Sequence, residues 1–197
     1  VVGLYLNPPE HAIVLSVDEK SQIQALNRTQ KSLPMFPGRL GTLTHDYKRN
    51  GTTTLFAAYN IAEGSVLADL KPRHRHQEWL DFLKTIDEAT APELDIHTIC
   101  DNYSTHKHAK VKRWLARHPR FHVHFTPTSS SWLNLVERWF RDLTEKCIRR
   151  GSFHSVAELE AKIWEYIEHS NNNPQPFRWI KKPQRYPGKS GQSQSRP

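Results

Sequence analysis

DIHTICD, residues 95–101, is a short apolar run that ends on the carboxylate of Asp101. The run follows QEWLDFLKTIDEA, residues 77–89, whose apolar residues recur at helical spacing. A helix that leads into a strand of this kind is typical of a layered α/β protein. Asn102 comes next, and an Asp-Asn pair after apolar residues is usually no more than a turn. The rest of the chain must therefore decide whether Asp101 has a function.

Three strands are expected before that helix. AIVLSVD, residues 12–18, is a compact β-branched run that we expect to end as a strand at Asp18. TTTLFAAYN, residues 52–60, and GSVLADL, residues 64–70, flank a short turn and predict an antiparallel hairpin. Residues 19–50 are polar and predict a long excursion. Its expected turns lie at Pro34, Pro37 and Gly38.

Helices and strands alternate in the second half of the chain. The patterns predict a helix over residues 106–117, a strand over 120–125, and a helix over 132–148 that starts after the polar PTSSS segment. A last helix, over 155–169, has Ser155 as its expected cap. The order β-β-β-α-β-α-β-α-α predicts a mixed central sheet with helices on both faces.

Composition indicates one soluble domain. The chain has 197 residues, of which 37% are hydrophobic, which is enough to bury a core. It contains neither a signal peptide nor the run of about 18 apolar residues that a membrane span needs, so a cytoplasmic protein without a membrane partner is expected. Cys100 and Cys147 are isolated and are expected to be buried free thiols.

The charge favours a polyanionic partner. Lys and Arg number 28 against 20 Asp and Glu, a formal net charge of +8, and a basic surface attracts nucleic acid. His106, Lys110, Arg113 and Arg117 should share one helix face, although a solvated face would look the same. The candidate DNA-binding residues are Arg73, Arg75, His106, Lys107, Lys110, Arg113, Arg117, Arg138 and Arg141.

Several other side chains have a more ordinary interpretation. The pair His122 and His124 is spaced to share one face of a strand, but no third ligand is apparent, so solvated or phosphate-facing rings are favoured over a metal site. Ser129 to Ser131 look like helix-start residues rather than nucleophiles. Core packing is expected for Trp132, Val136, Trp139, Phe140 and Leu143.

Three acids occupy related positions in the predicted fold. Asp18 and Asp101 each end a strand, and Glu137 lies about one turn into the helix that follows the fifth strand. If the two strands are parallel neighbours, the three carboxylates converge. Such a cluster repels itself and calls for a divalent cation, and oxygen ligands favour Mg²⁺ or Mn²⁺.

Two ions about 3.5 to 4 Å apart would clamp the attacking and leaving oxygens of a phosphoryl displacement, which is nuclease and strand-transfer chemistry. Each acid also has an ordinary interpretation. Asp18 and Asn102 could shape turns, and Glu137 could form a capping box with Asn134. The joint placement of the acids favours the functional interpretation.

Longer motifs around these acids resemble a known family. VDEKSQIQALNRTQ, HDYKRNGTTTLFAAYN, PRHRHQEWLDFL, DNYSTHKH and HFTPTSSSWLNLVERWF occur in this order. Together they resemble the catalytic domain of bacterial insertion-sequence transposases of the mariner-related DDE group, over about residues 1–179. The resemblance implies a ribonuclease H-like fold, two Mg²⁺ or Mn²⁺ ions held by Asp18, Asp101 and Glu137, and supporting roles for Asn102 and Asn134.

The same resemblance implies cleavage of DNA and transfer of the freed 3′-hydroxyl to a target during transposition. DNA is the implied partner, a homodimer is compatible with it, and a nucleoid-associated bacterial protein is expected. The helix-turn-helix region common in the family does not precede Val1, and residues 180–197 are expected to be a disordered basic tail. Two alternatives stay open: a catalytically inactive remnant that only binds DNA, and a ribonuclease H-like nuclease acting on another nucleic acid.

Overall fold

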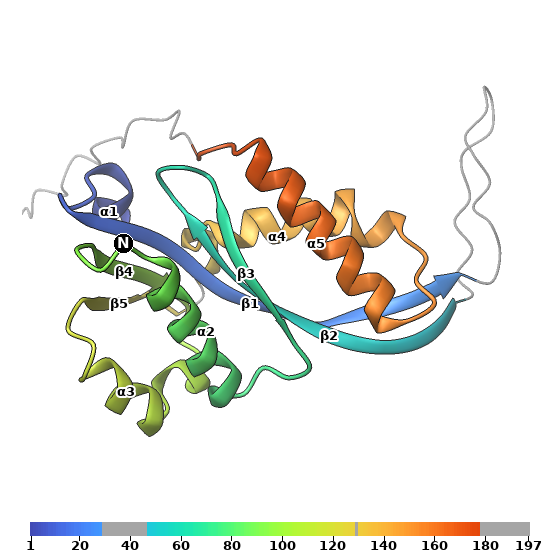
Figure 1. Ribbon diagram of the computed structural model, residues 1–197, viewed down its shortest axis with the longest axis horizontal. Helices are drawn as coiled ribbons and strands as arrows, with labels where there is room; N and C mark the ends of the chain where they lie inside the picture. Colours follow the sequence, from blue (N-terminus) through green and yellow to red (C-terminus); the bar gives the residue numbers. More distant parts are fainter. Residues whose placement is uncertain (29–46, 129, 178–197) are drawn as a thin grey trace, which may run out of the picture.

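The computed structural model describes residues 1–28, 47–128 and 130–177. Within them, a five-stranded sheet has the order β3-β2-β1-β4-β5 (Figure 1). The strands are β1 (Ala12–Arg28), β2 (Tyr47–Asn60), β3 (Val66–Lys71), β4 (Asp95–Cys100) and β5 (Phe121–Phe125). β2 runs antiparallel to β1 and to β3, whereas β1, β4 and β5 are parallel. The predicted mixed sheet is confirmed.

Helices cover both faces of this sheet, as predicted (Figure 1). One core layer contains side chains of α1, α4 and α5, and the other contains those of α2 and α3. The α-helices are α1 (Val2–Leu6), α2 (His76–Ala89), α3 (Ala109–Leu115), α4 (Val136–Lys146) and α5 (Val156–Asn172). Short 3₁₀ helices are η1 (Ser104–Lys107), η2 (Ser131–Leu133) and η3 (Ile148–Arg150). Among the described residues, no helix is both long enough and apolar enough to cross a bilayer.

The first strand does not end at Asp18, and that prediction was wrong. β1 continues to Arg28 because its polar second half pairs with the start of β2, which supplies the backbone hydrogen bonds that the side chains do not reveal. The ladder shifts register between Lys20 and Ile23, and Gln22 has a positive φ of 53°. This bulge changes which residues face the core. The turns expected at Pro34, Pro37 and Gly38 lie outside the described residues.

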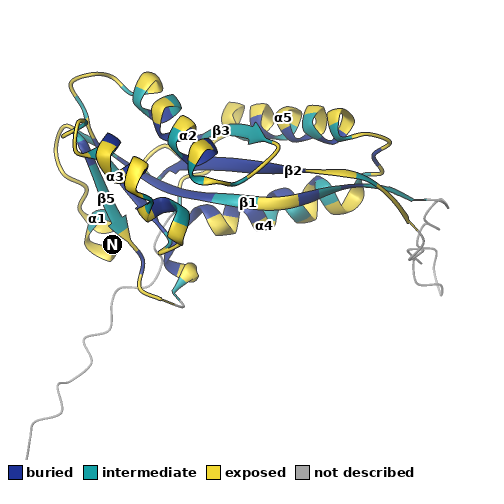
Figure 2. Ribbon diagram, turned by 90° about the horizontal axis from the view of Figure 1, so that it is seen from below, coloured by how far each residue is buried: buried dark blue, intermediate teal, exposed yellow. Residues whose placement is uncertain are grey.

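The alternation along β1 places the acids. Before the bulge, Val14 faces the layer of α4 and α5, and Leu15 and Val17 face the layer of α2 and α3. Asp18 therefore points toward α4, and its neighbour Glu19 points toward the opposite layer. Figure 2 shows the first half of β1 and the second half of β2 buried between helices that are exposed along their outer sides.

Two predicted helices are interrupted. The helix expected over 106–117 is split into η1 and α3 at His108, whose ψ of 146° is not helical. The helix expected over 132–148 is split at Asn134, whose ψ of 102° is extended, so α4 starts only at Val136. Trp132 consequently lies outside α4 and is 71% exposed, so its predicted core role was wrong. The other four predicted core residues of this region, Val136, Trp139, Phe140 and Leu143, are buried.

Other local predictions hold. Ser155 caps α5, because its hydroxyl accepts a hydrogen bond from the Glu158 amide at 3.1 Å. Cys100 and Cys147 are buried free thiols. The expected disordered tail and the hydroxyl of Ser129 lie outside the described residues. The short helix α1 was not predicted.

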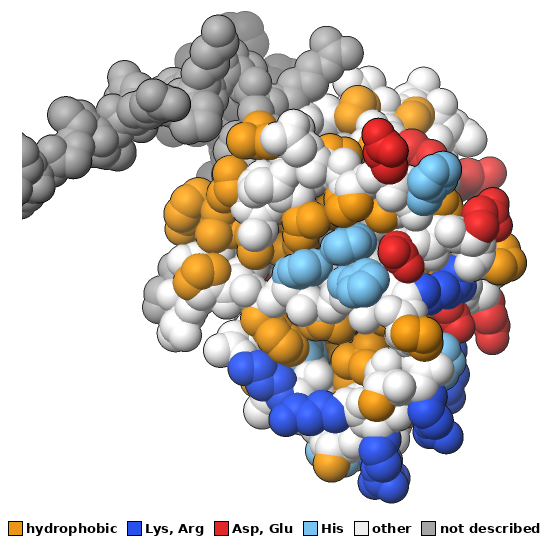
Figure 3. Space-filling model, turned by 90° about the vertical axis from the view of Figure 1, so that its left-hand side faces the viewer, with side chains coloured by type: hydrophobic (Ala, Val, Ile, Leu, Met, Phe, Trp, Pro, Cys, Tyr) orange, Lys and Arg blue, Asp and Glu red, His pale blue; other side chains and the backbone are white. Residues whose placement is uncertain are grey.

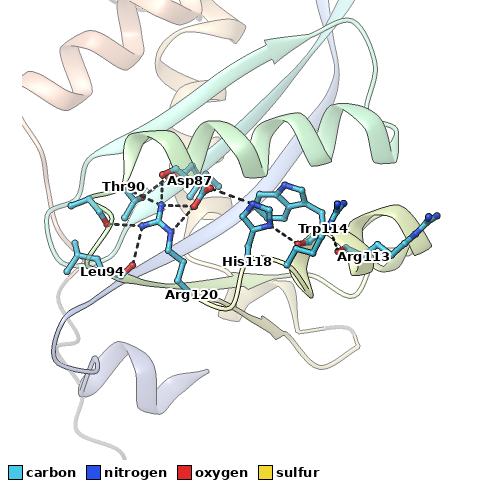
Figure 4. A network of polar contacts seen from close by, with 10 residues as sticks. Asp87, Thr90, Leu94, Arg113, Trp114, His118 and Arg120 are labelled. Carbon is cyan, nitrogen blue, oxygen red and sulfur yellow. Dashed lines mark hydrogen bonds and ion pairs between the residues drawn. The ribbon is translucent and has the colours of Figure 1, made fainter.

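Arg120 joins the second helix to the parallel strands (Figure 4). Its guanidinium contacts the Asp87 carboxylate at 2.6 Å and donates to backbone carbonyl oxygens of Asp87, Ala91 and Leu94. These carbonyls lie at and beyond the C-terminal end of α2, where helical partners run out. The contact fixes the C-terminal end of α2 against the starts of β4 and β5.

Candidate active site

Asp18 and Asp101 lie at the same edge of the sheet. Parallel pairing of β1 with β4 runs to Ser16 opposite Ile99, and two more residues along this register place Asp18 beside Asp101. Glu137 is the second residue of α4, which packs over β1. The charges of Asp101 and Glu137 both act on the Asp18 carboxyl group. The structure thus brings together the three acids that the sequence singled out.

The Asp18 carboxyl group is surrounded by other acids, and over the described part of the chain no cationic side chain is among the groups that shift its pKa. Burial raises the pKa of Asp18 to about 8, with further contributions from the charges of Glu19, Asp101 and Glu137 that outweigh the Glu19 amide hydrogen bond. Partial burial also raises the pKa of Glu137, and Asp101 adds to this while Lys20 opposes it. A bound cation would reverse these shifts.

Asn134 holds Asp18 in place. Asn134 is buried, with only 1% of the residue exposed. Its side-chain amide donates hydrogen bonds to Asp18 Oδ2 at 2.9 Å and to the Val17 carbonyl at 3.1 Å. Its Oδ1 accepts a short hydrogen bond from the Ser16 hydroxyl, which in turn accepts from the Val136 amide at 2.9 Å. The start of α4 is thereby tied to β1. The capping-box alternative was wrong, because Leu135, not Asn134, is the residue that caps α4.

His106 is buried, so its predicted place on an exposed basic helix face was wrong. Its Nδ1 lies 3.1 Å from Asp101 Oδ1, and its Nε2 lies 3.0 Å from Glu19 Oε2. Burial would lower the pKa of this ring, but its hydrogen bonds to Asp101, Cys100 and Glu19 raise it to about 12. The His106 ring lies against the ring of Trp79 of α2, with centroids 3.8 Å apart and planes tilted by 30°. Its hydrogen bond lowers the pKa of Asp101.

The remaining basic candidates are on the surface. Figure 3 shows Lys and Arg side chains gathered at its lower end, the end at which α3 lies in Figure 1. Arg75 already pairs with Glu78 at 2.5 Å and helps to cap α2, which is a structural role. DNA contact by these groups stays a prediction. The exposed candidates are Arg73, Arg75, Lys107, Lys110, Arg113, Arg117, Arg138 and Arg141. Asn102 is also exposed, next to Asp101.

Three histidines gather on one face of β4 and β5 (Figure 3). His97 stacks on His122, and its Nδ1 lies 2.9 Å from Nε2 of His124, so the pair predicted from sequence does have a third ring beside it. Burial lowers the pKa of His97 and of His124. Because the rings stack and bond to one another, their nitrogens do not converge on a common point.

The acid edge fits a hard divalent cation. Over the described ranges, no group of three or more His, Cys, Asp or Glu side chains forms a ready-made metal cage. Mg²⁺ rarely uses such a cage, because it is usually bound through one or two carboxylates, water and substrate phosphates. The donors at this edge are carboxylate oxygens, and neighbouring negative charges contribute to the raised pKa of Asp18. Both features suit binding of Mg²⁺ through a few carboxylates.

A mixed sheet of this order, with acids on two adjacent parallel strands and on the following helix, defines a ribonuclease H-like catalytic core. The model of the DDE superfamily endonucleases matches residues 13–160 of the chain. The protein therefore belongs to the DDE superfamily endonuclease family, and the resemblance seen in the sequence is confirmed.

Individual relatives agree with this family. The chain is 30% identical over 90 residues to the insertion element IS630 uncharacterized 39 kDa protein of Shigella sonnei, which covers 46% of the chain and 26% of that protein. The fold resembles the Mos1 transposase paired-end complex with left transposon end, with a TM-score of 0.60, 19% identity, and coverage of 85% of the chain and 51% of the other. The chain spans about a quarter of the first relative and half of the second.

A further solved structure shares the fold. The catalytic core domain of BIV integrase gives a TM-score of 0.51 at 15% identity, with 86% of the chain and 88% of that domain covered. At such identities the two structural likenesses show the fold alone.

Two residues of the site were not identified from sequence. Glu19 follows Asp18 directly, and strand alternation alone would have placed it on the opposite face from Asp18, toward the helix that carries His106. Lys20 affects the pKa of Glu137. Strand alternation places Lys20 on the same face of β1 as Asp18, because the regular pairing with β2 continues through Lys20.

Proposed function

We propose that this chain is the catalytic domain of a transposase, which cleaves DNA strands and joins the freed 3′-hydroxyl to target DNA. Asp18, Asp101 and Glu137 are the proposed ligands of two Mg²⁺ or Mn²⁺ ions. The two ions would supply activation of the attacking oxygen and stabilisation of the leaving oxygen. A homodimer on DNA is a further part of the proposal.

The observation that carries the proposal is the convergence of three carboxyl groups with a raised pKa at Asp18. Structural acids are usually paired with cations or hydrogen-bond donors, which lower the pKa instead. Perturbed groups gathered at one sheet edge are typical of functional sites. Family membership supports nuclease chemistry at this edge.

The chain's own residues have separate tasks in this scheme. Asn134 orients the Asp18 carboxylate through a direct hydrogen bond, and His106 orients that of Asp101. The exposed Lys and Arg side chains of η1, α3 and α4 provide positive charge for the phosphate backbone.

The direct test is the Asp101→Asn variant, measured by nicking of supercoiled plasmid DNA with Mg²⁺ or Mn²⁺ and by joining of a labelled 3′-hydroxyl oligonucleotide to the plasmid. Both activities should be lost while the variant stays folded, with an unfolding midpoint that falls only modestly because His106 keeps its contact with Glu19. The matched control is Asp95→Asn, which alters an exposed Asp at the opposite end of the same strand. It should keep full activity.

Wild-type rates in Asp101→Asn would refute the assignment. No cleavage by the wild-type chain, together with no calorimetric heat from Mg²⁺ or Mn²⁺, would favour the inactive remnant. Faster cleavage of an RNA-DNA hybrid than of duplex DNA would favour the other nuclease.

A further inference from the structure

Trp132 is an exposed aromatic side chain beside the acid edge. It is 71% exposed, whereas Trp79, Trp114 and Trp139 are 3 to 8% exposed. Large aromatic rings contribute to stability mainly through burial, so this ring gains little of that contribution. The ring is therefore available to a ligand, and what matters is where the backbone holds it.

The backbone around Trp132 is firmly held. The next residue, Leu133, is buried, and its carbonyl accepts a hydrogen bond from Tyr5 Oη at 2.6 Å. The residue after it is Asn134, whose side chain is bonded to Asp18. The Asn134 carbonyl also accepts from the Glu137 amide at 3.1 Å. The ring is thus presented outward by a segment that is anchored to the acid edge.

Trp132 and Glu137 line the same cavity, which has a volume of about 340 Å³. Arg138 and Arg141, both exposed on α4, also line it. The cavity therefore has a flat aromatic wall, a proposed catalytic carboxylate and two guanidinium groups. Guanidinium groups bind phosphate, and an aromatic ring stacks on a nucleobase.

We propose that this cavity binds an unpaired nucleotide of the DNA strand next to the bond that is cut or joined. The base stacks on Trp132, and Arg138 and Arg141 contact the flanking phosphates. The site would keep the strand end from pairing and hold it beside Glu137. The proposal rests on the proposed function, because it assumes that DNA reaches the acid edge.

The test is a binding measurement with chelator present, so that it does not depend on cleavage. A short duplex with an unpaired 3′ overhang is compared with a blunt duplex of the same sequence, by fluorescence anisotropy and by quenching of tryptophan emission. Wild-type protein should bind the overhang about tenfold more tightly, which lies within the range that stacking of one base on an aromatic ring contributes. Trp132→Ala should abolish this preference, and Trp132→Phe should keep most of it.

The matched control is Trp164→Ala, which removes a ring on α5 that is 44% exposed. Trp164→Ala should keep the overhang preference. In Trp132→Phe, the overhang duplex should no longer cause most of the quenching of tryptophan emission. Arg141→Gln should weaken both duplexes to a similar degree, because a phosphate contact is independent of base pairing.

An unchanged overhang preference in Trp132→Ala would overturn the proposal. An equal loss for both duplexes, or a change in sedimentation that shows Trp132 to be covered by a second copy, would do the same. Failure of cleavage in wild-type protein with the overhang preference intact would refute the proposed function and leave this site standing.

Discussion

Asp18 and Glu19 are adjacent carboxylates that face opposite layers of the molecule. Asp18 points toward α4 and receives hydrogen bonds from a neutral amide, Asn134, and from the Glu19 backbone. Glu19 points toward η1 and contacts the protonated ring of His106 at 3.0 Å. Its charge is balanced within the protein, whereas that of Asp18 is not. The same type of side chain thus serves the fold on one face of β1 and remains available to a cation on the other.

The largest difference between the two acids should appear in catalysis. Asp18→Asn should lower DNA nicking with Mg²⁺ by about a thousandfold or more, because electrostatic groups at a reacting phosphate contribute on this scale. Its unfolding midpoint should change little below about pH 8, because the raised pKa leaves the metal-free Asp18 carboxyl group largely protonated, so that a neutral amide replaces a neutral acid. Glu19→Gln should instead retain most of the nicking at a temperature where it is folded. Equal losses of activity in the two variants would remove the distinction between them.

Stability should show the opposite ranking. His106→Ala leaves the buried Glu19 carboxylate without its cation, and loss of one partner of a buried ion pair costs about 3 to 5 kcal/mol. The free energy of unfolding, measured by urea denaturation, should fall by roughly the lower of these values. Adding Glu19→Gln to His106→Ala should cost less than the sum of the single changes. Strictly additive losses would show that the two side chains are not coupled.

The pH dependence of stability isolates Asp18. Its pKa rises from an ordinary value of 3.8 to about 8 on folding, so between these values the native state binds more protons than the unfolded state. Stability of the metal-free protein should therefore fall as pH rises through this window, by at most about 1.4 kcal/mol per pH unit from this group. Mg²⁺ should reduce the slope, because it replaces the proton on the carboxyl group.

Urea unfolding of wild-type and Asp18→Asn protein at several pH values, with chelator or with Mg²⁺, measures this slope. The variant should lack the Asp18 contribution and should respond less to Mg²⁺. An identical slope in the two proteins would assign the pH dependence to other groups.

The sequence predicted much of this arrangement but not all of it. The apolar runs 12–18 and 95–101 predicted two buried strands, because burial on both faces leaves a strong apolar signal. Their parallel pairing was a condition of the active-site hypothesis, and the structure supplies it. Glu137 followed from its place at the start of a helix with buried Val136, Trp139, Phe140 and Leu143. These features depend on local patterns, which a single sequence records.

The features that the sequence concealed depend on partners far along the chain. His106 reads as one of a row of basic residues, and only the packing of η1 against β1 and α2 shows that it is buried between carboxylates. Trp132 reads as core because it fits the helical period, but Asn134 turns its side chain to Asp18 and interrupts that helix. The bulge at Gln22 likewise follows from pairing with β2 rather than from local preference.

The smallest effect, a loss of folding stability, is expected for the neutral hydrogen bonds that link β1 to the start of α4 on the Asp18 face. Ser16→Ala removes the donor to Asn134 and the acceptor for the Val136 amide, both fully buried, and should lower the free energy of unfolding by about 1 to 2 kcal/mol. The control is Thr98→Val on the neighbouring strand, whose buried hydroxyl has no hydrogen-bond partner among the described residues. Because that change removes an unsatisfied polar group at nearly constant volume, urea denaturation should show no loss of stability. A cost for Thr98→Val equal to that for Ser16→Ala would mean that shape, rather than the link from β1 to α4, sets the penalty at this edge.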